Sequence, residues 1–249
     1  MSDLFPHTGQ HADDLCVINS MHTDIGNHPQ AIMQMNTGSF QFVRPSVGSW
    51  VVYGLGTENQ NLPGFLSINP DFSARGARKY GCAFLPWATS GTAINSWGGG
   101  DSKIIPPALK DFEIPHTRNK AYSRREQREQ LDLLQSLNRS RLALDESNPK
   151  LEGIIHSFET AFRMQTDLPT LLNADREPAH VLKRYGVNVE PTDDFGRTCL
   201  TARRAVESGV RFVQLNLRFW DQHTKIEEGH AKLAAKSDLP IAGLIADLK

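Results

Sequence analysis

The chain has 249 residues, with 27 lysines and arginines against 28 aspartates and glutamates, which gives a formal net charge of −1. This balance offers no charge excess that would attract nucleic acid or an anionic membrane surface, so neither partner is expected. The three cysteines are widely and irregularly spaced, which fits neither a disulfide framework nor a zinc knuckle. No apolar run approaches the length of a membrane span, and the first residues lack the features of an export signal, so the chain by itself predicts a cytoplasmic protein.

A short apolar run behind two acidic residues, at positions 13–19, predicts a central strand of a parallel sheet, with Cys16 in its core. The polar stretch 20–28 follows this strand and leads into a helix predicted over residues 30–36, which a proline would start. The loop would therefore present free backbone N–H groups and the positive end of the helix to an oxyanion beside Thr23.

The middle of the chain predicts helices and one further strand. Residues 46–53 predict a short helix and residues 64–68 a strand. From position 69 to 120 the periodicity disappears, which indicates an irregular, functional excursion over the edge of the sheet. Apolar residues at three-to-four spacing predict helices over residues 124–144 and 151–165, and these should form an antiparallel pair.

The last third predicts half of a parallel α/β unit. A helical stretch ends at Gly209, where a residue free to adopt positive φ is favoured, and a buried strand is expected over residues 210–217. A charged loop is predicted over residues 224–236. A closing helix over residues 239–248 should then begin from Ser237 or the aspartate after it as its N-terminal cap.

A carboxylate and an imidazole, those of Asp221 and His223, come shortly after the strand predicted over residues 210–217. Because the carboxyl ends of parallel strands meet at one edge of a sheet, we expect them near the polar residues that follow the first strand. Side chains two residues apart can reach one cation, and mixed oxygen and nitrogen donors suit zinc, manganese or another divalent ion. The alternative is an ordinary surface turn.

The first polar stretch supplies further candidates. Thr23 offers a hydroxyl nucleophile whose pKa a nearby cation would lower, unless it serves as a helix cap. Asn27 is a candidate oxyanion donor, and His28 is a candidate ligand or base. The guanidinium of Arg44 matches the bidentate geometry of phosphate and sulfate, although a structural ion pair is the alternative role.

Several long motifs of the chain resemble those of the domain of unknown function 1501 family. They span residues 11–18, 20–23, 27–28, 37–38, 44–50, 53–63, 158–165, 202–204, 209–214 and 220–223. That family is similar to sulfatases in the alkaline-phosphatase-like superfamily, whose members use two metal ions to hydrolyse phosphate or sulfate esters. The resemblance implies an α/β fold with a mostly parallel sheet flanked by helices, and a small-molecule or glycan ester as substrate.

The resemblance also implies roles for single residues. Asp221 and His223 fall where the superfamily keeps an aspartate and a histidine on one metal, which would be zinc, manganese or calcium. The order of Thr23 before Asn27 and His28 resembles the nucleophile and substrate-binding residues of the nucleotide pyrophosphatases, with Arg44 as a further substrate-binding candidate. Many family members look exported from bacteria by a twin-arginine signal, which this chain lacks.

Family members are longer at both ends, where further ligand-bearing strands lie. We therefore expect residues 1–249 to form a single partial alkaline-phosphatase-like domain, incomplete at both ends, that binds metal poorly and is inactive as an isolated chain. The exposed sheet edges left by missing strands would favour aggregation. The alternative hypothesis is a non-catalytic binding protein that uses residues 69–120 and the helical pair 124–165 as a partner surface.

Overall fold

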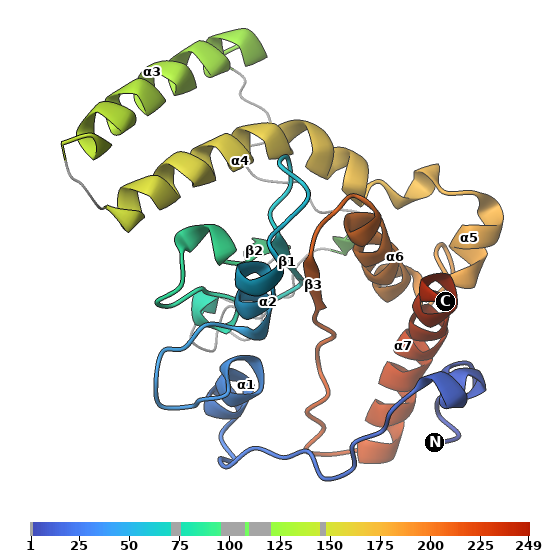
Figure 1. Cartoon of the computed structure of the whole chain (residues 1–249). Coiled ribbons are helices and arrows are strands. Elements are labelled where there is room, and N and C mark those ends of the chain that lie inside the picture. The colour runs from blue at the N-terminus through green and yellow to red at the C-terminus, as the bar shows by residue number, and fades with distance from the viewer. Residues whose placement is uncertain (1, 71–75, 96–107, 110–120, 145–147) are drawn as a thin grey trace.

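The computed structural model describes residues 2–70, 76–95, 108–109, 121–144 and 148–249 (Figure 1). Its centre is a small parallel sheet of three strands in the order β2-β1-β3, flanked by helices. The strands are β1 (Phe65–Ile68), β2 (Thr92–Ile94) and β3 (Phe212–Leu215). The α/β class expected from the sequence is therefore confirmed at this level. Among the described residues, no helix combines the length and hydrophobicity that crossing a membrane requires.

The helix–strand unit of the last third forms as predicted. Helix α6 (Asp193–Glu207) is followed by Gly209 with φ of +86°, and the chain then enters β3. Strand β3 pairs in parallel with β1, with Phe65 opposite Phe212 and Ile68 opposite Leu215. A left-handed residue after the helix reverses the chain direction, which is why α6 can pack back along β3.

Alternation along the strands gives the sheet two packed faces. On one face Phe65 and Phe212 lie edge to face, with ring centroids 5.1 Å apart, beneath α2 (Val47–Leu55). Helix α2 approaches closely at Gly48, because a Cβ there would come within 2.6 Å of both phenylalanine rings. On the other face Leu66 and Ile68 pack with side chains from α4 (Pro149–Leu172) and α6. The helix and strand predicted over residues 46–53 and 64–68 are thus confirmed.

The long helical pair is also confirmed. Helix α3 (Arg124–Leu142) begins with a capping box at Ser123 and runs antiparallel to α4. The side chain of Arg128 donates two hydrogen bonds of 2.9 Å to Glu159, and Gln135 donates to the carbonyl of Ile155 at 2.7 Å. Helix α4 continues seven residues beyond the predicted end, and part of the turn predicted between the helices lies outside the described residues.

The predicted start of the last helix is wrong. Helix α7 runs over Ile226–Leu248, so residues 226–236 of the predicted charged loop form its first three turns and Pro240 lies in its interior. Asp238 does not cap this helix. Its carboxylate accepts hydrogen bonds from the backbone N–H groups of His7 and Thr8, at 2.9 and 2.7 Å. Thr8 is 230 residues from Asp238 in the sequence, so a rule for helix caps, which considers only neighbouring residues, cannot predict this contact.

The strand predicted over residues 13–19 is also wrong. Residues Thr8–Asp14 form the 3₁₀ helix η1, and the run that follows is extended but outside the sheet. Cys16 is exposed, as are Val17 and Ile18 at 67% and 64%. The contacts of His7 and Thr8 with Asp238, together with an ion pair between Asp14 and Lys249, hold this part of the chain against α7 and away from β3.

The predicted irregular excursion over residues 69–120 contains more order than expected. Its described part holds the 3₁₀ helices η2 (Gly76–Lys79) and η3 (Trp87–Thr89), and then the outer strand β2. A strand of three residues is too short for its alternation to be recognised from sequence. The remainder of the excursion falls outside the described residues. The remaining short helices of the described chain are α1 (His28–Thr37), η5 (Ala174–Arg176) and α5 (Ala179–Arg184).

Candidate metal centre

Three side chains from two distant segments meet at the surface. His28, Asp221 and His223 each offer one ligand atom, and these atoms lie within 4.8 Å of one another. Nε2 of His28 is 3.4 Å from Oδ1 of Asp221, and Nε2 of His223 is 3.0 Å from the same oxygen. The carboxylate therefore stands between the two imidazoles, and all three side chains are more than half exposed.

The first of these segments is held by helix α1. Asn27 is its N-terminal cap position, His28 its first residue, and Pro29 fixes the backbone of its first turn. The helix ends at Gly38 in the left-handed conformation, as the sequence predicts. His28 is thus fixed at the backbone by the start of a helix, and not by the strand that the sequence predicts before it.

The second segment leaves the sheet at β3. Directly after this strand, Asn216 binds back to the carbonyl of Ile68 through both its backbone N–H and its side-chain amide, at 3.1 and 2.8 Å. The chain then turns through Phe219, which has φ of +72°, and reaches Asp221 and His223 before α7 begins. The two segments therefore converge as the sequence predicts, but through α1 and β3 in place of two neighbouring strands.

The donor set fits a divalent transition metal. Ligand atoms about 2.0–2.2 Å from a tetrahedral zinc lie roughly 3.3–3.5 Å from one another, close to the two spacings around Asp221. Two imidazoles and one carboxylate favour zinc or manganese over calcium, which prefers six or more oxygen ligands. Three protein ligands leave a coordination position for a substrate or water.

The other predicted site residues make the following contacts. The hydroxyl of Thr23 donates to the carbonyl of Ile25 at 3.0 Å and caps no helix, since the cap position of α1 is Asn27. The side chain of Asn27 makes no capping hydrogen bond. Arg44 is exposed and lies over the ring of Phe42, 5.9 Å from its centroid, and within the described residues it has no acidic partner.

Sequence reasoning missed a polar cavity at the carboxyl edge of the sheet. Each strand is followed by an asparagine, Asn69 after β1, Asn95 after β2 and Asn216 after β3, and all three line a cavity of about 80 Å³. The side-chain amide of Asn95 donates to Asn69 at 2.8 Å, and that of Asn69 donates to Thr198 at 3.3 Å. The repeated pattern of an apolar residue followed by asparagine was the available sequence signal. Ligands of α/β sheets bind at this edge.

Comparison with known families decides the identity of the chain. The model of the family described as "Protein of unknown function (DUF1501)" matches residues 1–249. The chain belongs to this family. No curated protein and no solved structure matches it. Membership of DUF1501 agrees with the motifs found in the sequence, and the family description assigns no activity, so the chemistry of this DUF1501 member has to be argued from its own residues.

Proposed function

We propose that this DUF1501 protein holds one divalent metal ion on His28, Asp221 and His223 as part of a site that hydrolyses sulfate or phosphate esters. The observation that carries the proposal is the convergence of three ligand-type atoms within 4.8 Å from segments nearly 200 residues apart. Convergence of this kind is not produced by a local sequence pattern. The sulfatase-like motifs of the sequence supply the choice of ester.

In this proposal, different residues of the protein have different roles in the reaction. When bound, a divalent ion supplies Lewis-acid stabilisation of the negative charge that develops on an ester oxygen. His28, Asp221 and His223 hold and orient that ion at the rim of α1. Thr23 is the candidate nucleophile, and its hydroxyl must give up the hydrogen bond to Ile25 before it can lose its proton. Asn27 and Arg44 remain the candidate groups for binding the anionic oxygens of the substrate.

Calorimetric titration with zinc, manganese and calcium tests the metal site. We expect zinc to bind weakly, with a stoichiometry of one and more tightly than calcium. Replacing one ligand, as in Asp221→Ala or His223→Ala, should weaken zinc binding about tenfold or more. His180→Ala changes an exposed histidine on α5 and serves as the matched control. Equal zinc binding by the wild type and both ligand variants would refute the site.

Hydrolysis of p-nitrophenyl sulfate and p-nitrophenyl phosphate tests the reaction. The cluster provides the ligands of one cation, whereas the superfamily that the sequence resembles uses two. We therefore expect this chain alone to turn over both esters near the background rate, even with metal added. Efficient metal-dependent turnover that Asp221→Ala abolishes would support the hydrolase and contradict the expectation of an incomplete site.

One observation favours the alternative of a non-catalytic binding protein. On α3, Leu133 and Leu137 are 65% and 60% exposed, while Gln135 faces α4 and is fully buried. One face of the helical pair thus carries apolar side chains that are not covered by the described residues, as a partner surface would. Absence of zinc binding in the titration would favour this alternative.

A further inference from the structure

A second pocket lies at the opposite end of the sheet from the candidate metal centre. It has a volume of about 530 Å³ and lies between α4 and the segment that leads from η3 into β2. Pro63 and Thr92, which line it, stand at the amino ends of β1 and β2. Asp221 and His223 instead follow the carboxyl end of β3. The pocket is therefore separate from the proposed metal site, and its ligand is a separate question.

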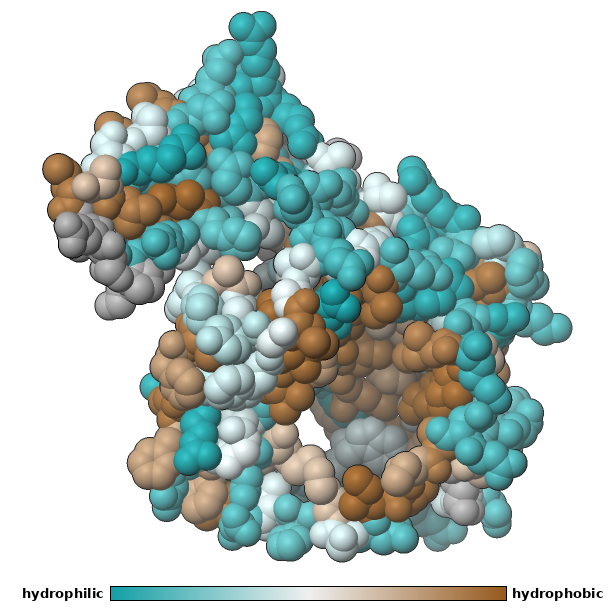
Figure 2. Space-filling view, viewed as in Figure 1, coloured by the Kyte–Doolittle hydropathy of each residue, from teal (hydrophilic) through white to brown (hydrophobic). Residues whose placement is uncertain are grey.

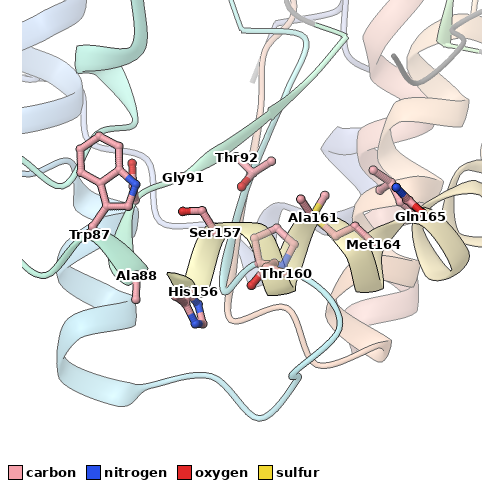
Figure 3. A pocket seen from close by; sticks show the side chains of 13 residues that line it. Trp87, Ala88, Gly91, Thr92, His156, Ser157, Thr160, Ala161, Met164 and Gln165 are labelled. Atoms are coloured by element: carbon pink, nitrogen blue, oxygen red, sulfur yellow. The ribbon is translucent and has the colours of Figure 1, made fainter. Parts of the chain in front are cut away.

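An aromatic platform forms one end of this pocket. Trp87 of η3 is 57% exposed and lies at the opposite end from Gln165 of α4 (Figure 3). Its side chain packs directly on Gly153 of α4, where an added Cβ would come within 2.6 Å of the Trp87 Cβ. This contact fixes the base of the indole against the helix and leaves ring surface open. Met164 and Leu168 add apolar surface farther along the pocket.

Hydrogen-bonding groups face one another across the pocket. Thr92 comes from β2 and Ser157 from α4, and Figure 3 shows them on facing sides. Within the described part of the chain, Thr92, His156 and Thr160 have no side-chain hydrogen-bond partner. Ser157 donates to the carbonyl of Gly153 at 2.7 Å, which leaves its oxygen free to accept. The pocket thus offers several rotatable hydroxyls and an imidazole to a ligand.

Among the described residues, the lining of this pocket contains a single ionisable side chain, His156. None of the 13 lining residues is an aspartate, glutamate, lysine or arginine. A charged ligand would lose hydration here without gaining a paired charge, which is costly. A purely apolar ligand would leave the hydroxyls unpaired against it. The ligand that fits is uncharged and has both a flat apolar face and a rim of hydrogen-bonding groups.

We propose that this pocket binds a neutral carbohydrate of one or two pyranose units. The C–H face of the sugar ring stacks on Trp87, and its hydroxyls bind Thr92, Ser157 and Thr160. A planar heterocycle could also stack on the indole. Its edge, however, needs donors and acceptors in fixed pairs, whereas rotatable hydroxyls match the hydroxyl rim of a sugar.

Saturation-transfer difference NMR and calorimetry with cellobiose, maltose and lactose test this proposal on the whole chain. We expect at least one of the three to bind at millimolar concentration, with signal on the protons of one ring face. Trp87→Ala should abolish binding, and Thr160→Val, which removes a hydroxyl but keeps the side-chain shape, should weaken it about threefold or more. Trp50→Ala changes an exposed tryptophan on α2 and is the matched control.

Three outcomes would overturn the proposal. These are binding of none of the three sugars, sugar binding that is unchanged in both Trp87→Ala and Thr160→Val, and binding of adenosine in their place. Circular dichroism of each variant shows whether it is folded, and Thr160→Val keeps the test valid if Trp87→Ala is not. Zinc titration of the same samples tests a different site, so absence of sugar binding would not count against the proposed metal site.

Discussion

Asp238 is an interior residue of helix α7 and is almost fully buried. Its carboxylate accepts hydrogen bonds from His7 and Thr8, near the N-terminus of the chain. Burial alone would raise the pKa of Asp238, but hydrogen bonds from the backbone N–H groups of Thr8 and His7 outweigh it and hold the pKa below its ordinary value of 3.8. A group with a depressed folded pKa stabilises the fold above its unfolded pKa, and this stabilisation is lost as the pH falls through the folded pKa. Attachment of the N-terminal segment should therefore weaken below about pH 4.

Asp238→Asn tests this attachment at the level of one residue. The amide keeps the size of the side chain, but its NH2 group cannot accept a hydrogen bond, so one of the two backbone N–H groups loses its acceptor and the other loses a charged one. We therefore expect a loss of about 1–3 kcal/mol in the free energy of unfolding at neutral pH. The difference from wild type should shrink below about pH 4, where the aspartate becomes protonated. Urea denaturation at both pH values measures it. Glu227→Gln, an exposed acid on the same helix, is the control, and equal stability of the two variants would contradict the argument.

At the scale of elements, β3 is one of the two edge strands of the sheet. Within the described chain it pairs only with β1, and all four of its residues are half-buried. The apolar run that contains Val17 and Ile18 lies outside the sheet and is exposed. Figure 2 shows a hollow in this face of the molecule with hydrophobic residues around it. Unpaired strand edges and exposed apolar runs are the usual templates for association between chains.

The double substitution Val17→Lys and Ile18→Lys should therefore reduce self-association. We expect wild-type protein to form oligomers whose mass grows with concentration, and the double variant to shift toward monomer. Light scattering after size-exclusion chromatography measures the mass. Leu55→Lys, which changes an equally exposed leucine at the end of α2, should leave the mass unchanged. Equal loss of oligomers in both variants would show that added charge, and not this segment, is responsible.

The elements that the sequence predicts correctly are those defined by local rules. Gly209 after α6 and Gly38 after α1 both adopt positive φ, where a helix ends by a local backbone preference. The strand predicted over residues 13–19 does not form, because an apolar run becomes a strand only where it can pair with the edge of a sheet. Here Asp238 and Lys249 draw the preceding residues to α7. Contacts between residues so far apart in the sequence cannot be predicted from the local spacing of apolar residues.

At the scale of the whole molecule, the parallel sheet separates two candidate sites. The histidine and aspartate cluster follows its carboxyl edge, and the Trp87 pocket lies at the amino ends of β1 and β2 beneath α4. The spacing of Asp221 and His223 predicts two of the three ligands of the first site. The third, His28, is a candidate ligand in the sequence, but only the placement of α1 brings it to the other two. The second site could not be predicted, because its walls come from η3, β2 and α4, three elements brought together by packing alone.

Zinc binding by His28→Ala is the most direct test of the claim that two distant segments build one metal centre. His28 lies nearly 200 residues from the other two ligands and joins them only if the fold is as described. We predict that calorimetry will find zinc binding weakened about tenfold or more in His28→Ala and unchanged in His180→Ala. Zinc binding by His28→Ala that equals that of the wild type would contradict the account.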